Sequence, residues 1–236
     1  MNPALPPEQP LAAPAQHLWL WELRAIPELV GSLIPRPLAK RLPAGSGQPV
    51  VVLPGFGAND AAMILMVRRL KRLGYRAQSW GLGRNHGDMR KLVPAMAAGV
   101  LKLAQATDQK VSLVGWSLGG TIAREVARDH PAAVARLVTL GSPVVGGPKY
   151  TFVARAYIRK GYNLDRIEKS VAACQATPLC VPVTALYDRH DAVVAWPACI
   201  DRHNACVEHI EVNCSHFGMG FDRSVFVQIA KALAKR

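Results

Sequence analysis

A serine stands between two glycines in the segment Gly115-Trp116-Ser117-Leu118-Gly119, directly behind the apolar run 111–114. This order predicts a buried strand that feeds a sharp turn into a helix, with the serine at the apex of the turn. The small residues two before and two after the serine relieve the crowding of such a turn. A hydroxyl held in this way could attack a carbonyl carbon, while the backbone N–H of Leu118 points into the same space. The chemistry that this segment predicts is acyl transfer.

Acyl transfer to a serine also needs further N–H donors for the oxyanion that forms. The turn Pro54-Gly55-Phe56-Gly57 follows the first predicted strand, and its glycines allow backbone N–H groups to face the site. We expect the N–H of Phe56 to act beside that of Leu118. In the alternative interpretation, Gly55 and Gly57 serve only a tight turn.

The carboxylate that orients the base is sought among two aspartates behind the predicted strand 181–187. Asp188 adjoins the end of the strand, where it could cap a turn or pair with Arg189. Asp191 precedes the apolar residues 192–194, which would bury its flank and fix its carboxylate toward a histidine. We therefore expect Asp191 to be the acid, with Asp188 as the alternative.

The base is expected to be His216, which follows the last predicted strand and precedes the C-terminal helix. The segment 213–220 around it forms a loop that can bring the imidazole over Ser117. The remaining histidines are interpreted as solvated or structural: His17, His86, His130, His190, His203 and His209. The order Ser117, Asp191, His216 is one in which serine triads occur, and each residue follows a different strand.

The elements that must position these residues alternate along the chain after about residue 43. Strands are expected at 50–53, 76–80, 111–114, 137–140, 181–187 and 209–212, and helices at 60–73, 89–106, 118–130 and 222–234. Short apolar strands that alternate with helices predict an α/β fold with a mostly parallel sheet and helices on both faces. In such a sheet, the site residues lie at the carboxyl ends of strands, on one edge.

With these motifs in place, the chain resembles small bacterial α/β-hydrolases of the lipase and esterase type from about residue 18 to its C-terminus. The matching stretches are 53–56, 80–85, 115–120, 140–143, 191–194 and 215–218. The resemblance implies an α/β-hydrolase fold of about six strands, a small cap before the acid, and ester hydrolysis without a cofactor. Two segments depart from the family: the turn 54–57 has Pro-Gly-Phe-Gly where many relatives have His-Gly-x, and the acid loop has Ala192 where such lipases often have glycine.

The composition restricts the partners of this protein. Its 236 residues carry a formal net charge of +13, and residues 68–91 hold eight basic side chains against Asp88 alone. We interpret this stretch as a solvated helix face and a basic loop, with attraction to an anionic membrane or acidic polymer as the alternative. No nucleic-acid-binding motif accompanies the charge, so nucleic acid is not an expected partner. No Cys/His pattern for a metal is present.

The division of the chain is expected to be simple. Residues 1–16 are rich in Pro and Ala and are expected to be disordered, whereas 17–236 form a single domain in which 144–180 are the cap candidate. The apolar segment 18–42, in which Pro27 and Pro35 separate short helical turns, either packs over the domain or lies in a membrane interface through Trp19 and Trp21.

The sequence also gives expectations about compartment. No run of about 20 apolar residues and no signal peptide is recognised, so we expect a cytoplasmic protein with peripheral membrane contact as an option. The five cysteines are interpreted as free thiols, with Cys174–Cys180 and Cys199–Cys206 as alternative disulfide pairs.

These observations predict a serine hydrolase that cleaves an ester or lipid through a Ser-His-Asp triad and an acyl-enzyme. The same triad could instead transfer the acyl group to an alcohol or cleave a thioester. A membrane-associated binding protein without activity, on a hydrolase scaffold, is the alternative outside enzymology. The substrate pocket is expected at Trp116, Val194, Trp196, Phe217 and Met219. Neither the acyl chain nor the oligomeric state follows from these residues.

Overall fold

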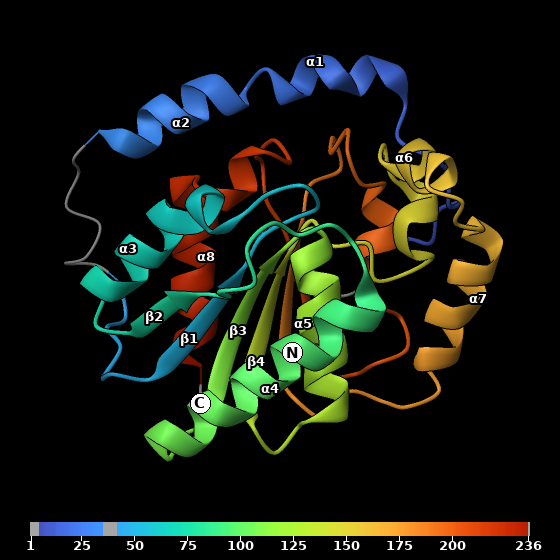
Figure 1. Ribbon diagram of the computed structural model, residues 1–236. Helices are drawn as coiled ribbons and strands as arrows, with labels where there is room; N and C mark the ends of the chain where they lie inside the picture. Colours follow the sequence, from blue (N-terminus) through green and yellow to red (C-terminus); the bar gives the residue numbers. More distant parts are fainter. Residues whose placement is uncertain (1–4, 35–41, 236) are drawn as a thin grey trace.

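A sheet of six parallel strands in the order β2-β1-β3-β4-β5-β6 forms the centre of the molecule (Figure 1). The structure is a computed structural model and describes residues 5–34 and 42–235. The strands are β1 (Pro49–Leu53), β2 (Arg76–Ser79), β3 (Val111–Trp116), β4 (Val134–Leu140), β5 (Val183–Tyr187) and β6 (Val207–Glu211). The predicted α/β-hydrolase architecture is confirmed, with every strand parallel to its neighbours.

Helices cover both faces of the sheet. Side chains of α3 (Ile64–Arg72) and α8 (Arg223–Ala234) pack on one face, and those of α4 (Met89–Thr107) and α5 (Leu118–Asp129) on the other (Figure 1). The helices α6 (Ala154–Arg159) and α7 (Leu164–Cys174) fall within the predicted cap 144–180. Short 3-10 turns are η1 (Gln16–Leu18), η3 (Asp60–Met63), η4 (Gly147–Tyr150), η5 (Trp196–Cys199) and η6 (Gly218–Gly220).

The two-sided covering explains why the strands read as apolar runs. All five residues of β1 are buried, with Val50 and Val52 facing α3 and α8, and Val51 and Leu53 facing α4 and α5. A strand without a solvent side needs apolar residues at consecutive positions. Each such side chain contributes about 1.5–3 kcal/mol when it is fully buried. This burial fixes the height at which each strand ends, and therefore where the loops of the site begin.

The N-terminal helices lie across the edge of the sheet at which the strands end (Figure 1). They are α1 (Trp19–Glu22) and α2 (Ala25–Leu33), and η1 precedes them. The prediction that Pro27 separates two turns was wrong, because the helices break at Leu23 and Arg24 and Pro27 lies in the first turn of α2. A proline is tolerated there, since the N–H groups of a first turn have no partner within the helix. The predicted break at Pro35 lies outside the described residues.

The remaining expectations concern the tail, the cysteines and the membrane. Residues 5–15 carry no helix or strand, although Leu11 packs against the cluster around Val193 and Trp196. The five cysteines are all free, so neither predicted disulfide pair forms. In the described ranges, no helix has the length and apolar character needed to cross a bilayer.

Candidate active site

Ser117 lies at the junction of β3 and α5 in a backbone conformation with φ 54° and ψ −124°. A residue with a side chain is strained by about 1–3 kcal/mol in such a region and stays there only where its surroundings hold it. The Ser117 N–H donates to Leu140 O at 2.7 Å, and Ser117 O accepts the N–H of Gly120 at 2.9 Å. The predicted strand, sharp turn and helix are therefore present, with the serine at the apex.

Glycines allow the backbone of this turn to close. A Cβ added to Gly115 would lie 2.4 Å from the Cα of Gly120, and one added to Gly119 would lie 2.5 Å from the carbonyl oxygen of Leu53. Both distances are shorter than any normal contact, so the turn requires residues without a side chain. The contact with Leu53 also brings the end of β1 against the serine.

The turn 54–57 follows β1 and runs beside the serine. A Cβ on Gly55 would stand 3.2 Å from the Cβ of Ser117, which shows how closely the two segments approach. Across the described part of the chain, the N–H of Phe56 has no acceptor within the protein. The N–H of Leu118 opens α5, where a helix leaves its first N–H groups without an intrahelical partner. Both groups are thus able to donate to a ligand.

Asn85 holds this turn in place, and the sequence assigned it no role. Its side chain is fully buried and donates to Pro54 O at 2.9 Å, while its backbone oxygen accepts the N–H of Gly57 at 2.7 Å. Asn85 N–H in turn donates to Ala58 O at 2.8 Å. The loop after β2 therefore fixes the loop after β1. The sequence signals for this contact were a polar residue in a glycine-rich loop and its place in the stretch 80–85 that matches the family.

The second half of the site is a buried pair of Asp191 and His216. Asp191 Oδ2 lies 2.7 Å from His216 Nδ1, and each residue is 2% exposed. The other oxygen, Oδ1, accepts the N–H groups of Val193 at 2.8 Å and Val194 at 2.7 Å. With Nδ1 engaged by the carboxylate, Nε2 is the ring nitrogen left to accept a proton.

The pKa of His216 is raised above its usual value. Burial alone would lower this pKa, but the charge and hydrogen bond of Asp191, together with the charge of Glu22, outweigh the burial. The imidazole is therefore a stronger base than a free histidine.

Asp188, the alternative acid, serves a different contact. Its carboxylate accepts the N–H of His190 at 2.6 Å and the N–H of Cys214 at 2.8 Å. His190 Nδ1 lies 3.3 Å from the same carboxylate. Asp188 thus connects the loop after β5 with the loop after β6, and burial raises its pKa. The geometry favours Asp191 as the partner of His216.

Two carboxylates of the N-terminal helices reach the same loops, and sequence reasoning missed both. Glu22 of α1 accepts the N–H groups of Ala192, His216 and Phe217 at 3.1–3.3 Å. Glu28 of α2 accepts the N–H of Ser215 at 3.0 Å and its hydroxyl as well. The available signal was two acidic residues, six apart, in an otherwise apolar segment.

The predicted pocket residues lie in varied surroundings. Trp116 donates from Nε1 to His216 O at 3.0 Å, and Phe217 stands edge-on to the His216 ring at 6.1 Å and is exposed. Val194, Trp196 and Met219 are buried in the core clusters. Two surface cavities, beside α2 and beside α7, are lined by none of these residues. The assignment of a pocket to them stays a prediction.

The described residues contain no His, Cys, Asp or Glu cluster that could hold a metal ion.

Residues 48–195 match the family model of the alpha/beta hydrolase fold. The chain therefore belongs to the alpha/beta hydrolase family. Among characterised proteins, it is similar to a pimeloyl-[acyl-carrier protein] methyl ester esterase of Vibrio vulnificus, 33% identical over 112 residues, which are 47% of this chain and 42% of the relative. The enzyme of the same name from Citrobacter koseri is 48% identical over 62 residues, or 26% of this chain and 23% of the relative. The chain matches less than half the length of these relatives.

Solved structures share the fold at low sequence identity. A lipase of Bacillus licheniformis has a TM-score of 0.59 and 15% identity, covering 80% of this chain and 94% of its own. The thioesterase domain from the curacin biosynthetic pathway has a TM-score of 0.57 and 16% identity, covering 81% of this chain and 93% of its own. These similarities concern the fold alone.

The sharp turn at Ser117 gives a stability prediction, in which Gly119 is compared with a glycine of another helix. We expect Gly119→Ala to destabilise the protein by about 1–3 kcal/mol or more, because its Cβ would meet the backbone oxygens of Leu53 and Pro54, which cannot move aside. Gly99→Ala in α4 is the control, since its Cβ would meet only the end of Met96 at 3.7 Å. This control should be neutral or stabilising by about 0.5–1 kcal/mol. Urea unfolding of both variants measures the difference, and equal midpoints would contradict the close packing.

Proposed function

We propose that this protein is a serine hydrolase that cleaves carboxylic esters with Ser117 as nucleophile, His216 as base and Asp191 as the acid that orients it. The observation that carries the proposal is the buried hydrogen bond of 2.7 Å between Asp191 Oδ2 and His216 Nδ1, at the sheet edge where Ser117 is held with positive φ. A buried Asp–His pair and a strained serine, from three different loops, have no common explanation in packing. They are the parts that acyl transfer requires.

In the first half of the reaction, Ser117 Oγ attacks the ester carbonyl carbon as Nε2 of His216 takes the hydroxyl proton. The negative charge that develops on the carbonyl oxygen is stabilised by the N–H groups of Phe56 and Leu118. Asp191 stabilises the imidazolium through Nδ1. The tetrahedral intermediate then collapses: the bond to the alkoxy group breaks, His216 returns the proton to it, and the alcohol leaves an acyl-Ser117 ester.

The second half repeats these roles with water. His216 takes a proton from a water molecule whose oxygen attacks the acyl carbon, and the same two N–H groups hold the oxyanion. Collapse releases the carboxylic acid and returns the proton to Ser117. No group besides these side chains, the two N–H groups and water is needed for the atoms and charges to balance.

The choice of an ester rests on the relatives. Two characterised proteins with matching segments are methyl ester esterases. The same residues would cleave a thioester or pass the acyl group to an alcohol, because the acceptor is not chosen by the triad. Comparison of ester, thioester and alcohol acceptors with one enzyme preparation separates these reactions.

The test is covalent labelling of the serine. A fluorophosphonate probe should label the native protein at Ser117, and Ser117→Ala should lose both the label and esterase activity on p-nitrophenyl esters. We expect the rate to fall by a factor on the order of 10⁴ or more, because only binding and the oxyanion donors remain. Ser170→Ala, an exposed serine on α7, is the matched control and should keep both signals. Full activity in Ser117→Ala would refute the assignment, and an unlabelled native protein would favour the non-catalytic alternative.

The Asp191–His216 pair also predicts the pH dependence of activity. His216 acts as a base only when it is neutral, and its pKa is raised, so kcat/KM should fall as the pH drops through a value above the ordinary 6.5. In Asp191→Asn the negative charge is lost while the burial remains. The fall of kcat/KM on the acidic side of the pH profile, which we call the acidic limb, should therefore move to lower pH. The rate should fall by about 10⁴, as the orientation of the imidazole is also lost.

The comparison variant is Asp188→Asn, whose carboxylate accepts backbone N–H groups and does not contact His216. The acidic limb should stay in place in this variant. If the acidic limb moved in Asp188→Asn and stayed in place in Asp191→Asn, Asp188 and not Asp191 would be the acid that orients His216.

A further inference from the structure

The helices α1 and α2 turn buried polar side chains and two tryptophans toward the protein, and most of their aliphatic side chains toward solvent. We call residues 19–34 the strap. Glu22 and Ser32 on its inner side are buried, whereas Leu20, Leu23, Ile26, Val30 and Leu33 on its outer side are 57–74% exposed. A surface helix of a soluble protein has the opposite arrangement, with its apolar stripe toward the core. The outer side of the strap is therefore built to meet an apolar phase.

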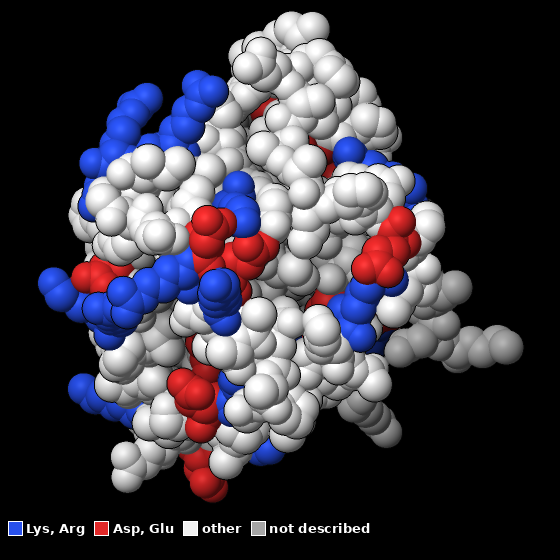
Figure 2. All heavy atoms as spheres, turned by 90° about the vertical axis from the view of Figure 1, so that its right-hand side faces the viewer, with Lys and Arg blue, Asp and Glu red and all other residues white. Residues whose placement is uncertain are grey.

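The position of the strap leaves that side uncovered. The strap is the outermost layer above the sheet edge, and no other described element lies beyond it (Figure 1). In Figure 2 the highest part of the molecule is white, with Lys and Arg side chains beside it at the upper left. Transfer of exposed Leu, Ile and Val side chains from water to an apolar phase is favourable, so a surface that buries all five of them stabilises the contact.

The charges around the strap indicate an anionic partner. The only acidic side chains of the strap, Glu22 and Glu28, point inward, so its outer side carries no carboxylate. Arg69 of α3 donates to Ser32 O, and Arg223 of α8 donates to Ile34 O, so cationic side chains flank its end. The chain as a whole carries a formal net charge of +13.

We propose that the outer side of the strap docks on an anionic phospholipid bilayer, with its leucines and isoleucines in the headgroup–acyl boundary and the flanking cations at the lipid headgroups. An uncharged apolar helix face beside basic residues is the arrangement that binds such interfaces. A second copy of the chain fits less well, because two molecules of net charge +13 repel each other. This inference is independent of the ester hydrolysis proposed above.

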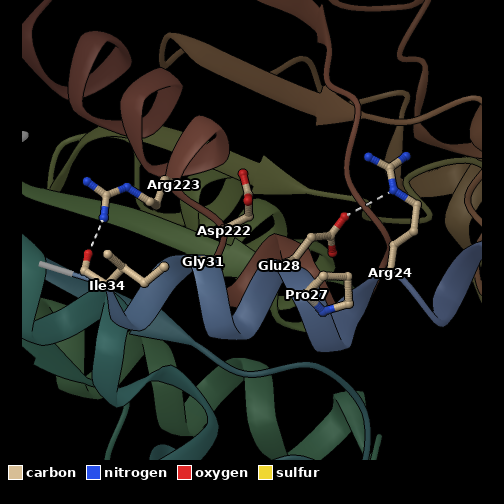
Figure 3. A pocket seen from close by; sticks show the side chains of 7 residues that line it. All are labelled: Arg24, Pro27, Glu28, Gly31, Ile34, Asp222 and Arg223. Atoms are coloured by element: carbon tan, nitrogen blue, oxygen red, sulfur yellow. Dashed lines mark hydrogen bonds and ion pairs between the residues drawn. The ribbon is translucent and has the colours of Figure 1, made fainter. Parts of the chain in front are cut away.

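The cavity beneath the strap does not supply the lipid site. It measures about 330 Å³ and lies between α2 and α8 (Figure 3). Two guanidinium groups, Arg24 and Arg223, and two carboxylates, Glu28 and Asp222, line it together with Pro27, Gly31 and Ile34. Arg24 Nε stands 3.7 Å from Glu28, and the two guanidinium groups equal the two carboxylates in number, so the lining carries no net charge. A balanced lining does not select an anion, and the contact is assigned to the outer side.

The test is co-sedimentation of the purified protein with vesicles. Native protein should bind vesicles of phosphatidylcholine and phosphatidylglycerol in about 0.1 M salt, bind phosphatidylcholine vesicles weakly, and release in about 1 M salt. The triple variant Leu23→Gln, Ile26→Gln, Val30→Gln should bind anionic vesicles at least about ten-fold more weakly. Leu101→Gln, an exposed leucine on α4, is the control and should bind like the native protein.

Circular dichroism of the triple variant verifies that the fold is kept, which is expected because more than half of each of the three side chains is exposed. Equal vesicle binding by the native protein and the triple variant would overturn the proposal. The proposal would also be overturned if the native protein did not bind anionic vesicles and formed a dimer in analytical sedimentation. The outer side of the strap would then be covered by a second copy of the chain.

A second inference comes from the inner side of the strap, where Glu22 joins two loops. Its Oε1 accepts the N–H of Ala192 at 3.3 Å and that of His216 at 3.1 Å, and its Oε2 accepts the N–H of Phe217 at 3.2 Å. No lysine, arginine or histidine forms an ion pair with it among the residues described. One buried carboxylate thus takes donors from the loop of the acid and from the loop of the base.

The geometry points to Glu22 as a positioning residue that sets the distance between Asp191 and His216, a role that rests on the proposed function. It touches neither the substrate nor the reacting oxygen, and acts through the backbone of both loops. The titratable groups around the imidazole are Asp191 and Glu22, with Asp188 and Glu28 bound to the neighbouring Cys214 and Ser215. Burial raises the pKa of Glu22, which the three N–H groups partly oppose.

The test compares Glu22→Ala and Glu22→Gln in ester hydrolysis and its pH profile. Glu22→Ala should lower kcat/KM by about 10- to 100-fold, since a misplacement of about 1 Å at a catalytic group has an effect of this size. Glu22→Gln keeps an oxygen acceptor and should recover most of the rate. Its acidic limb should nevertheless move to lower pH, because the charge that helps to raise the pKa of His216 is gone.

Glu28→Ala is the control, since it also loses hydrogen bonds to the base loop but does not contact His216, and its acidic limb should stay in place. The positioning role would be overturned if the acidic limb stayed in place in Glu22→Gln and kcat/KM of Glu22→Ala equalled that of the native protein. Fluorophosphonate labelling of the native Ser117 keeps that outcome distinct from a failure of the proposed function.

Discussion

The reversal of the chain at Ser117 is the constraint on which the rest of the structure depends. β3 must turn into α5 within one residue, and a serine takes the positive φ only because its surroundings hold it. The turn closes against β1, where a side chain on Gly119 would strike Leu53 O. That contact fixes the end of β1 and the turn with Phe56 beside the serine. One strained residue thus aligns two neighbouring strands, and the apolar packing of both faces of the sheet sustains the strain.

Buried charge forms the second layer of the site. Asp191 and His216 are almost excluded from water, so their hydrogen bond is stronger than an exposed one, but an unpaired partner would be costly. The protein meets this cost with backbone donors: two N–H groups reach Asp191, and Asp188 ties the loop after β5 to the loop after β6. Burial alone would lower the pKa of His216, but this pKa is raised because the carboxylates of Asp191 and Glu22 outweigh the burial.

The strap connects the site to the outside of the molecule. Its inner contacts are the hydrogen bonds of Glu22, Glu28 and Arg69, together with the aromatic contacts of Trp19 and Trp21. Its exposed aliphatic residues face outward, and a cavity lies between α2 and α8 (Figure 3). Polar contacts of this kind are specific in geometry but contribute little net free energy, typically about 0.5–1.5 kcal/mol for each hydrogen bond.

The sequence by itself determined the sheet, the sharp turn at Ser117 and the identity of the residues at the strand ends. Consecutive apolar residues in a strand and a serine between glycines are local patterns, so they are recognisable without the fold. It also favoured Asp191 over Asp188 from the apolar residues that follow. Only the tertiary structure decided which aspartate meets His216, and that Asn85 fixes the turn with Phe56, because these contacts join segments far apart in the chain. The sequence also did not show which side of the strap faces the protein. The side with Glu22 faces inward because this carboxylate accepts backbone N–H groups from loops 170 and 194 residues away in the chain.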